Sequence, residues 1–592
     1  MQKRYDASKA VYDTTWSEIN VSCEACHGPG SKHVAWANGH SPLLQKGGQG
    51  GFESAREIPL NPPFSKGEVS SKGLLLSFNE RGGVNWTMDG ASGIARRSLA
   101  RATNIEIDAC ARCHSRRGVL TEDYVHGKPL LESHLPALLT PGLYYADGQI
   151  QDEVYEYGSF VQSAMHAAGV TCSDCHEPHT LKLRAEGSNV CSQCHAPGKF
   201  ASAEHHHHKT NSTGAGCLGC HMPERVYMVV DPRRNHSFRI PRPDLSAKLG
   251  TPNACNGCHA DKNLNWTVAA FAKWYKPMES AQQRYAEALH AGRSGAPGAE
   301  TKLLAVVQDS SLPAIARATA LAELRRYLSP KSLPIVQDNL KDSDPLARFG
   351  ALRAIEGIDP KVHAANSAAL LRDPFRAVRT TAASLLAAAP AQTLTSEQRT
   401  ALDKAIQEYV ATQQSNADRP EGQLNLGLLY TRRGDVKKAE EHYRKAIQLQ
   451  PSFAQAYVNL ADLYRAQERD KDGEKILREA LTAVPEDASV AHALGLLLVR
   501  EKKLNEALPW LKRAAALEPK SARFAYVYAV ALHSSGDAGA AVAVLEKALA
   551  AHPNDRDILA ALASFHEARG DAAVAKKYAA RLRALSETDQ RP

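Results

Sequence analysis

All twelve cysteines of this 592-residue chain lie between Cys23 and Cys258, in six pairs of identical spacing. Two residues separate the members of each pair, and a histidine follows the second cysteine every time. Because the chain holds only 24 histidines, six trailing histidines do not arise by accident. The six motifs are Cys23, Cys26 and His27; Cys110, Cys113 and His114; Cys172, Cys175 and His176; Cys191, Cys194 and His195; Cys217, Cys220 and His221; and Cys255, Cys258 and His259.

The spacing C-x-x-C-H is the attachment signature of c-type haem. Each thiol forms a thioether bond with a haem vinyl group, and the histidine becomes the proximal iron ligand. Zinc ribbons, redox dithiols and structural disulfides are the alternatives. Zinc needs four ligands and does not explain the trailing histidines, and redox dithiols occur singly. The sequence therefore predicts six covalently bound haem c groups.

An electron-carrying low-spin haem needs a second axial ligand, commonly another histidine. Position along the chain selects four candidates for these distal ligands: His33, His166, His179 and His236. His126 or His134 is a candidate for a fifth iron, and one of His205–His208 for a sixth.

Residues 1–265 carry all six motifs, which leaves roughly 44 residues for each haem, too few for separate side-chain cores. We therefore expect the haems to form much of the core, with short helices, irregular loops and almost no sheet. Residues 41–73 are rich in Gly, Pro and Ser and are expected to form a disordered insertion. A helical connector is expected at 266–299.

Two sets of repeats follow, so the expected fold class is all-α: a multihaem domain, then an α-solenoid. Residues 300–395 repeat with a 31-residue step that puts Arg317, Arg348 and Arg379 in register, a pattern typical of HEAT-like helix pairs. Residues 420–589 repeat every 34 residues, the period of tetratricopeptide repeats (TPRs). The five expected TPRs are 420–453, 454–487, 488–521, 522–555 and 556–589.

Charge and apolar runs exclude two classes of function. No run approaches 18 apolar residues, so no membrane-spanning helix is expected. The formal charge of +8 is interpreted as compensation for haem propionates by pairs such as Arg96-Arg97, Arg116-Arg117 and Arg233-Arg234, and nucleic-acid binding has no support. Covalent haem attachment predicts a periplasmic or extracytoplasmic protein. Residues 1–20 lack the apolar segment of a signal peptide, so we expect the chain to be truncated at its start.

Several stretches give the chain a resemblance to multihaem cytochromes of the cytochrome c-552/4 type fused to C-terminal TPRs. They are Cys23–Ser31, Gly169–Cys172, Cys220–Pro223, His236–Pro243 and Gly250–Cys255. Members of this group usually carry a signal peptide and further haem motifs upstream of the segment that matches Met1. The resemblance therefore implies a truncated N-terminus, and it implies electron transfer without fixing a substrate.

Two functions compete at this point. The favoured one is an electron carrier that docks a redox partner protein on its cytochrome domain or on the solenoid. The alternative is an oxidoreductase of the nitrite or hydroxylamine type, which needs one open haem iron; related nitrite reductases mark it with Lys in place of the motif histidine, and no motif here has Lys. A haem-based sensor is a third possibility. No catalytic residue is assigned.

Overall fold

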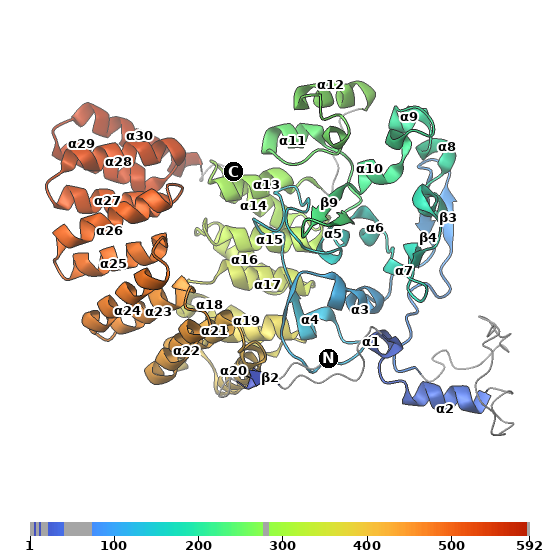
Figure 1. Cartoon of the computed structure of the whole chain (residues 1–592), viewed down its shortest axis with the longest axis horizontal. Helices are drawn as coiled ribbons and strands as arrows, with labels where there is room; N and C mark the ends of the chain where they lie inside the picture. The colour runs from blue at the N-terminus through green and yellow to red at the C-terminus, as the bar shows by residue number, and fades with distance from the viewer. Residues whose placement is uncertain (1–4, 7–10, 13–21, 41–73, 276–282, 589–592) are drawn as a thin grey trace.

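The computed structural model describes residues 5–6, 11–12, 22–40, 74–275 and 283–588, and the insertion expected at 41–73 lies outside these ranges. The protein is mostly helical (Figure 1). Every sheet in the described ranges is a two-stranded antiparallel pair. Among the described residues, no helix is both long and apolar enough to cross a bilayer.

The first part of the chain has short helices joined by irregular segments, as expected from the sequence. Its helices are α1 (Cys23–His27), α2 (Ser31–His40), α3 (Ile105–His114), α4 (Leu130–Ser133), α5 (Tyr157–Phe160), α6 (Ala164–Ala167), α7 (Cys172–Cys175), α8 (Pro197–Phe200), α9 (Ala203–His206), α10 (Cys217–His221), α11 (Pro243–Leu249) and α12 (Leu264–Trp274). Short 3-10 turns at Gly187–Gln193 and Cys255–Gly257 hold the first cysteine of the fourth and sixth pairs.

Five hairpins accompany these helices, more sheet than the sequence led us to expect. They pair β1 (Tyr5–Asp6) with β2 (Val11–Tyr12), β3 (Trp86–Asp89) with β4 (Ile94–Arg97), β5 (Arg117–Val119) with β6 (His134–Pro136), β7 (His176–Glu177) with β8 (Lys182–Leu183), and β9 (Glu224–Tyr227) with β10 (Asp231–Arg234).

A buried carboxylate joins the second and third motifs. Glu106, in the first turn of α3, accepts hydrogen bonds from the Thr171 hydroxyl at 2.8 Å and the Ser173 amide at 2.6 Å. These donors lie at the start of α7, whose N-terminal amides have no partners inside the helix. Glu106 therefore fixes the two motif-bearing helices against each other.

Successive helices fill the stretch 300–395 that the sequence predicts to be HEAT-like. They are α14 (Ala299–Gln308), α15 (Ala314–Leu324), α16 (Ser332–Asn339), α17 (Pro345–Ala354), α18 (Pro360–Ser367) and α19 (Arg376–Leu386). The array extends to α13 (Ala286–Ser294), in the expected connector, and to α20 (Ser396–Ser415), beyond the predicted stretch. The three arginines in register each pair with an acid further along: Arg317 with Asp342, Arg348 with Asp373, and Arg379 with Glu408. This repeated ion pair fastens successive helix pairs together.

Five helix pairs then follow at 34-residue intervals. They are α21 (Pro420–Arg432) and α22 (Val436–Leu449), α23 (Ala454–Arg465) and α24 (Asp470–Ala483), α25 (Ala488–Arg500) and α26 (Leu504–Leu517), α27 (Ala522–Ser534) and α28 (Ala538–Ala551), and α29 (Arg556–Ala568) and α30 (Ala572–Thr588). Small residues let the paired helices approach closely. A Cβ on Gly427 would lie 2.4 Å from the Tyr443 ring, and one on Gly495 would lie 2.5 Å from Leu511.

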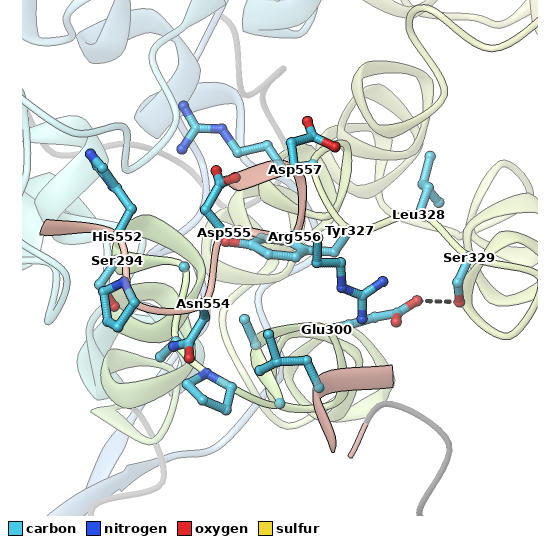
Figure 2. A pocket seen from close by; sticks show the side chains of 18 of the residues that line it. Ser294, Glu300, Tyr327, Leu328, Ser329, His552, Asn554, Asp555, Arg556 and Asp557 are labelled. Atoms are coloured by element: carbon cyan, nitrogen blue, oxygen red, sulfur yellow. Dashed lines mark hydrogen bonds between the residues drawn. The ribbon is translucent and has the colours of Figure 1, made fainter. Parts of the chain in front are cut away.

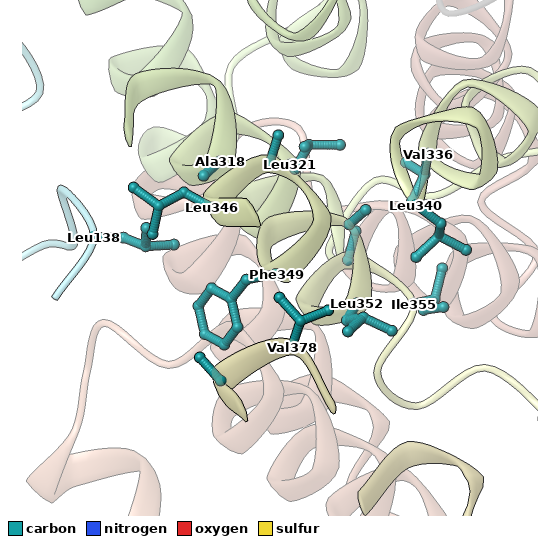
Figure 3. Close-up of a cluster of buried hydrophobic side chains, with 14 of the residues drawn as sticks. Leu138, Ala318, Leu321, Val336, Leu340, Leu346, Phe349, Leu352, Ile355 and Val378 are labelled. Atoms are coloured by element: carbon teal, nitrogen blue, oxygen red, sulfur yellow. The ribbon is translucent and has the colours of Figure 1, made fainter. Parts of the chain in front are cut away.

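The largest hydrophobic cluster is shared between the motif-bearing part and the HEAT-like helices. Leu138 belongs to it together with Leu321, Phe349 and Leu352 (Figure 3). Leu139 is a fully buried member of the same cluster. Hydrogen bonds cross the same boundary. The Thr412 hydroxyl donates to the carbonyl of Leu120 at 2.7 Å, and Arg379 reaches Glu132 at 3.0 Å. The boundary expected near residue 265 is therefore not a break in packing, because residues 115–163 contribute to the core of the repeats.

Residues 164–265, which carry the last four motifs, pack differently. Only Tyr227 from this stretch belongs to any of the three buried hydrophobic clusters. The TPRs, in contrast, have two clusters of their own, built from α22–α26 and from α27–α29. The solenoid curves round so that its last helices return toward α13 and α14 (Figure 1).

Candidate functional site

None of the eighteen motif cysteines and histidines is buried. Cys23, Cys113 and Cys258 are exposed, the other nine cysteines are half-buried, and all twelve are free thiols. Free cysteine is among the residue types most often found in the interior. The partial exposure of these thiols therefore indicates that another chemical group covers the motif residues.

The six motifs lie next to one another in the order in which they occur along the chain. The thiols of Cys110 and Cys172 hydrogen-bond each other, as do those of Cys191 and Cys217. Burial raises the pKa of Cys26, and the nearby Cys110 and Cys113 add to the shift. The third and fourth motifs are near enough for Cys194 to raise the pKa of Cys175, to which burial contributes most, and the same holds for Cys220 and Cys255 of the fifth and sixth motifs.

Four motif histidines each face a second histidine. The ring centroids are 6.2 Å apart for His27 and His179, 6.4 Å for His176 and His236, 6.1 Å for His221 and His205, and 6.1 Å for His259 and His208. The two rings are within 6° of parallel in the first pair and within 10° in the third. The partners come from outside the motifs in every case.

Hydrogen bonds through Nδ1 orient five of these eight rings. Nδ1 of His27 bonds the carbonyl of Leu76 at 2.8 Å, and Nδ1 of His221 bonds the carbonyl of Arg239 at 2.9 Å. Three partner rings are held in the same way: His236 by the carbonyl of Arg234, His208 by that of His206, and His179 by the Glu177 carboxylate. Metal-binding histidines usually bond through one nitrogen like this, which leaves Nε2 for the metal.

These pairs fit a haem iron. Two imidazoles that face each other across one metal through ~2 Å bonds have ring centroids about 6 Å apart. A haem supplies four equatorial nitrogens of its own, so the protein needs to add only two. Within the described ranges, no three His, Cys, Asp or Glu side chains converge to form a metal site. The donor set therefore suits a haem better than a bare zinc ion, which takes four protein ligands.

The separation of two imidazole rings is not sufficient by itself to identify a pair of iron ligands. His206 and His208 also lie 6.4 Å apart, with their rings tilted by 39°, and neither belongs to a motif. What distinguishes the four pairs is that each joins one motif histidine to one partner. A haem attached to the adjacent cysteines would bring its iron to that motif histidine.

The four proposed distal ligands have different outcomes. His179 and His236 lie opposite motif histidines, as the prediction requires. The His33 ring lies 5.7 Å from Trp36, and Nε2 of His166 lies 3.0 Å from a guanidinium nitrogen of Arg101. Among the described residues, neither of these two rings faces a motif histidine.

The run His205–His208 supplies two partners where the sequence reasoning assigned it only one. Neither candidate for the fifth ligand, His126 or His134, has a ring contact with a motif histidine in the described ranges, although His126 lies beside Gly28 at the end of the first motif. His134 is buried and its Nδ1 bonds Ser133, whereas Nε2 of His126 is buried without a hydrogen-bond partner in the described part of the chain. Folding of α9 placed His205 and His208 near different motifs, which linear spacing does not reveal.

The histidines of the second and fourth motifs lack such a partner ring among the described residues. Nδ1 of His114 lies 3.0 Å from Oε2 of Glu156, and this hydrogen bond raises the pKa of His114. Arg233 lies 3.6 Å from the other oxygen of Glu156. The His195 ring instead packs edge-on against Phe200, with centroids 5.3 Å apart.

Three arginines near the motifs each have a guanidinium nitrogen that could still donate a hydrogen bond. The Nε atoms of Arg97, Arg112 and Arg117 are buried and have no hydrogen-bond partner in the described ranges. Two of these belong to the pairs expected to neutralise haem propionates, and the third, Arg112, lies inside the second motif. Buried unpartnered guanidinium nitrogens are costly, so an anionic group that bonds them stabilises the fold.

A separate cavity of about 920 Å³ lies far from the motifs, where the end of the solenoid meets its beginning (Figure 2). Its walls come from residues 294–300, 326–331 and 552–557. Glu300 in this cavity bonds Ser329 at 2.5 Å, and Asp555 caps α29. These polar groups therefore have structural partners.

Comparisons with known proteins bear on the C-terminal part. Tetratricopeptide-repeat family models match residues 420–453, 454–487 and 498–565, which confirms the predicted TPRs. The solved structure of MamA protein is 20% identical, with 29% of this chain and 93% of that one covered and a TM-score of 0.26. YrrB, described as a TPR protein with an unusual peptide-binding site, is 22% identical over 31% of this chain and 91% of that one, with a TM-score of 0.25. No curated protein matches the chain.

Proposed function

We propose that this chain is a multihaem c-type cytochrome that carries electrons through six covalently bound haems. The single observation that supports this most is the set of four imidazole pairs, each joining a motif histidine to a histidine from elsewhere. The motif cysteines would supply the covalent attachment, and the paired histidines would hold the iron. When bound, the haem supplies reversible one-electron oxidation and reduction.

The order of the motifs supports a continuous route for electrons. Cysteines of each motif lie near those of the next along the chain, so six haems attached to them would form a row from Cys23 to Cys258. Residues at the two ends of the row are then the points at which electrons enter and leave. The protein residues hold and orient the haems and limit the access of water.

A protein partner belongs to this proposal. TPRs indicate a role in binding proteins or peptides, so we assign the solenoid to docking a redox partner. Because HEAT-like helices share a core with residues 115–163, a partner held by the solenoid stays at a fixed distance from the second motif. Haem attachment requires an extracytoplasmic location, and we propose a periplasmic or extracytoplasmic protein.

The alternative remains an oxidoreductase of nitrogen compounds with one open iron. The specific observation in its favour is that His114 and His195 face no second imidazole among the described residues. This observation does not identify a reaction, so electron transfer stays the first proposal.

Intact mass and haem content test the proposal directly. The chain is produced with an export signal in a host that attaches haem c, and its mass should exceed that of the polypeptide by six haems. Cys110→Ala combined with Cys113→Ala should remove one haem. A chain that binds several zinc ions and shows no haem absorption would refute the proposal.

A further inference from the structure

An open groove of about 710 Å³ lies between β4, with the residues that follow it, and the end of α6. Two large apolar side chains line it, Ile94 and Leu99, which are 41% and 57% exposed. Three arginines, Arg96, Arg97 and Arg101, line the same groove. An apolar surface bordered by guanidinium groups suits a flat apolar ligand that carries carboxylates.

Two of these arginines are held in place without an acidic partner. Arg97 and Arg101 each donate to two backbone carbonyls. Among the described residues, no carboxylate forms an ion pair with either of them. The carboxylate of Glu80 lies nearby, but it accepts a hydrogen bond at 3.0 Å from an amide in the first turn of α3. Arg96 differs from the other two, because it is paired with Asp89 at 2.9 Å.

The space beside the two unpaired arginines is kept open by a glycine. Nε of Arg97 is buried and has no hydrogen-bond partner in the described ranges. A Cβ on Gly169, which also lines the groove, would lie 3.6 Å from this nitrogen and 3.6 Å from Cβ of Arg101. The φ of +91° at Gly169 is one that residues with side chains rarely adopt. An anion that accepts a hydrogen bond from this nitrogen would remove the cost of leaving it unpaired.

The fourth motif adjoins this groove. The amide of Ala95 donates to the carbonyl of Cys194 at 2.7 Å, and Ile94 pairs directly with His195 in an antiparallel bridge. Side chains of directly opposed residues in such a pair point to the same face. His195 therefore leaves the backbone on the side of Ile94, which lines the groove.

We propose that the groove receives the haem of the fourth motif, and that Arg97 and Arg101 bind its propionates and raise its reduction potential. This inference rests on the proposed haem content. The apolar lining matches the macrocycle, and two unpaired cations match its two carboxylates. Reduction adds one negative charge to a haem, so positive charge beside it favours the reduced form. The effect is larger for half-buried charges, because solvent and salt screen them less.

The experiment is a redox titration of the full six-haem chain. Cys191→Ala combined with Cys194→Ala removes the fourth haem and so identifies its step in the titration. Arg97→Gln should shift the oxidised-to-reduced ratio of that haem at least tenfold toward oxidised, which is about 59 mV for one electron. Arg97→Lys, which keeps the charge, should retain most of the potential. Arg101→Gln is the second variant and should act in the same direction as Arg97→Gln.

Lys199→Gln is the matched control. Lys199 is an exposed cation four residues after His195, outside the groove, and it also donates to backbone carbonyls, at 3.0 and 3.1 Å. Because solvent screens its charge, this variant should change the ratio by less than about threefold. Unchanged potentials in both arginine variants, an equal shift in Lys199→Gln, or a shift confined to another haem would overturn the inference alone. A chain without covalent haem would overturn the proposed function as well.

Discussion

Residues 164–265 and the TPRs bury apolar surface in two different ways. The TPRs build two clusters from their own side chains, each side chain at most 9% exposed. Residues 164–265 contribute one residue, Tyr227, to any cluster. Fifteen of the nineteen exposed large hydrophobic side chains in the described residues lie before residue 275. The difference indicates that one region completes its core by itself and the other needs a group from outside.

The HEAT-like helices stand between these cases. Their cluster takes in Leu138, Leu139 and Tyr144 from the motif-bearing part. Arg293 strengthens the same boundary by donating to the carbonyl of Tyr144 at 3.2 Å. The second motif is therefore joined to the solenoid, whereas the proposed function makes haem the group that completes the packing around the last four motifs.

Withholding haem should have the largest effect. In a chain made where haem is not attached, residues 164–265 should lose amide protection by at least ~10³-fold, because no side-chain cluster holds them. A fragment of residues 415–592 should remain helical under the same conditions, since a solenoid repeat contacts only its neighbours. Hydrogen exchange and circular dichroism measure these outcomes. Equal protection of residues 164–265 with and without haem would remove the contrast between the two regions.

Two leucine substitutions separate the shared core from the TPR core. Leu139→Ala, at 0% exposure in the shared cluster, should destabilise the motif-bearing part and the HEAT-like helices together by ~2–5 kcal/mol. Leu494→Ala, also fully buried but within the TPRs, should cost a similar amount there only. Hydrogen exchange measured residue by residue shows which part of the protein each substitution destabilises. If Leu139→Ala left the HEAT-like helices unaffected, the shared core would be wrong.

Close helix packing in the TPRs predicts a smaller effect. Gly427→Ala places a methyl group against the Tyr443 ring and should destabilise the first repeat by ~1–3 kcal/mol. Gly539→Ala in α28 is the control, because its new methyl group meets only a side-chain oxygen at 3.8 Å. That change should stabilise its helix by up to ~1 kcal/mol. Urea denaturation, followed by hydrogen exchange in each repeat, measures whether each substitution lowers or raises stability.

Acid should weaken the TPRs through His492. This ring is buried against Phe524, and burial lowers its pKa to about 4. In the unfolded chain the ring takes up its proton near pH 6.5, so the stability it contributes is full above that pH and falls as the pH drops toward 4. Between pH 7 and pH 5 the loss should be about 1–2 kcal/mol. His492→Leu should abolish this part of the pH dependence, and an unchanged dependence would contradict the assignment.

Periodicity made the repeats predictable from the sequence. The 34-residue step gave the starting residues of all five TPR helix pairs, because each repeat meets only its neighbours and local pattern decides local structure. The 31-residue step likewise identified Arg317, Arg348 and Arg379 as equivalent. The shared core was not predictable, since Leu138 and Leu139 meet Leu321 only after the chain folds back.

The histidine partners were predictable only in part. His179 and His236 were identified from their position beside a motif, and the structure brings both to motif histidines. His33 and His166 met the same criterion, yet their rings contact Trp36 and Arg101. Which imidazole reaches which motif depends on the orientation of short helices such as α9. The spacing of histidines in the sequence does not predict that orientation.

Removing single partner histidines tests the central claim most directly. In the six-haem chain, His179→Ala, His236→Ala, His205→Ala and His208→Ala should each convert one further haem from low spin to high spin in electron paramagnetic resonance. His166→Ala should leave the number of low-spin haems unchanged, because its Nε2 lies 3.0 Å from a guanidinium nitrogen of Arg101. If His166→Ala opened an iron while the four partner variants did not, the imidazole pairs would not be the iron ligands.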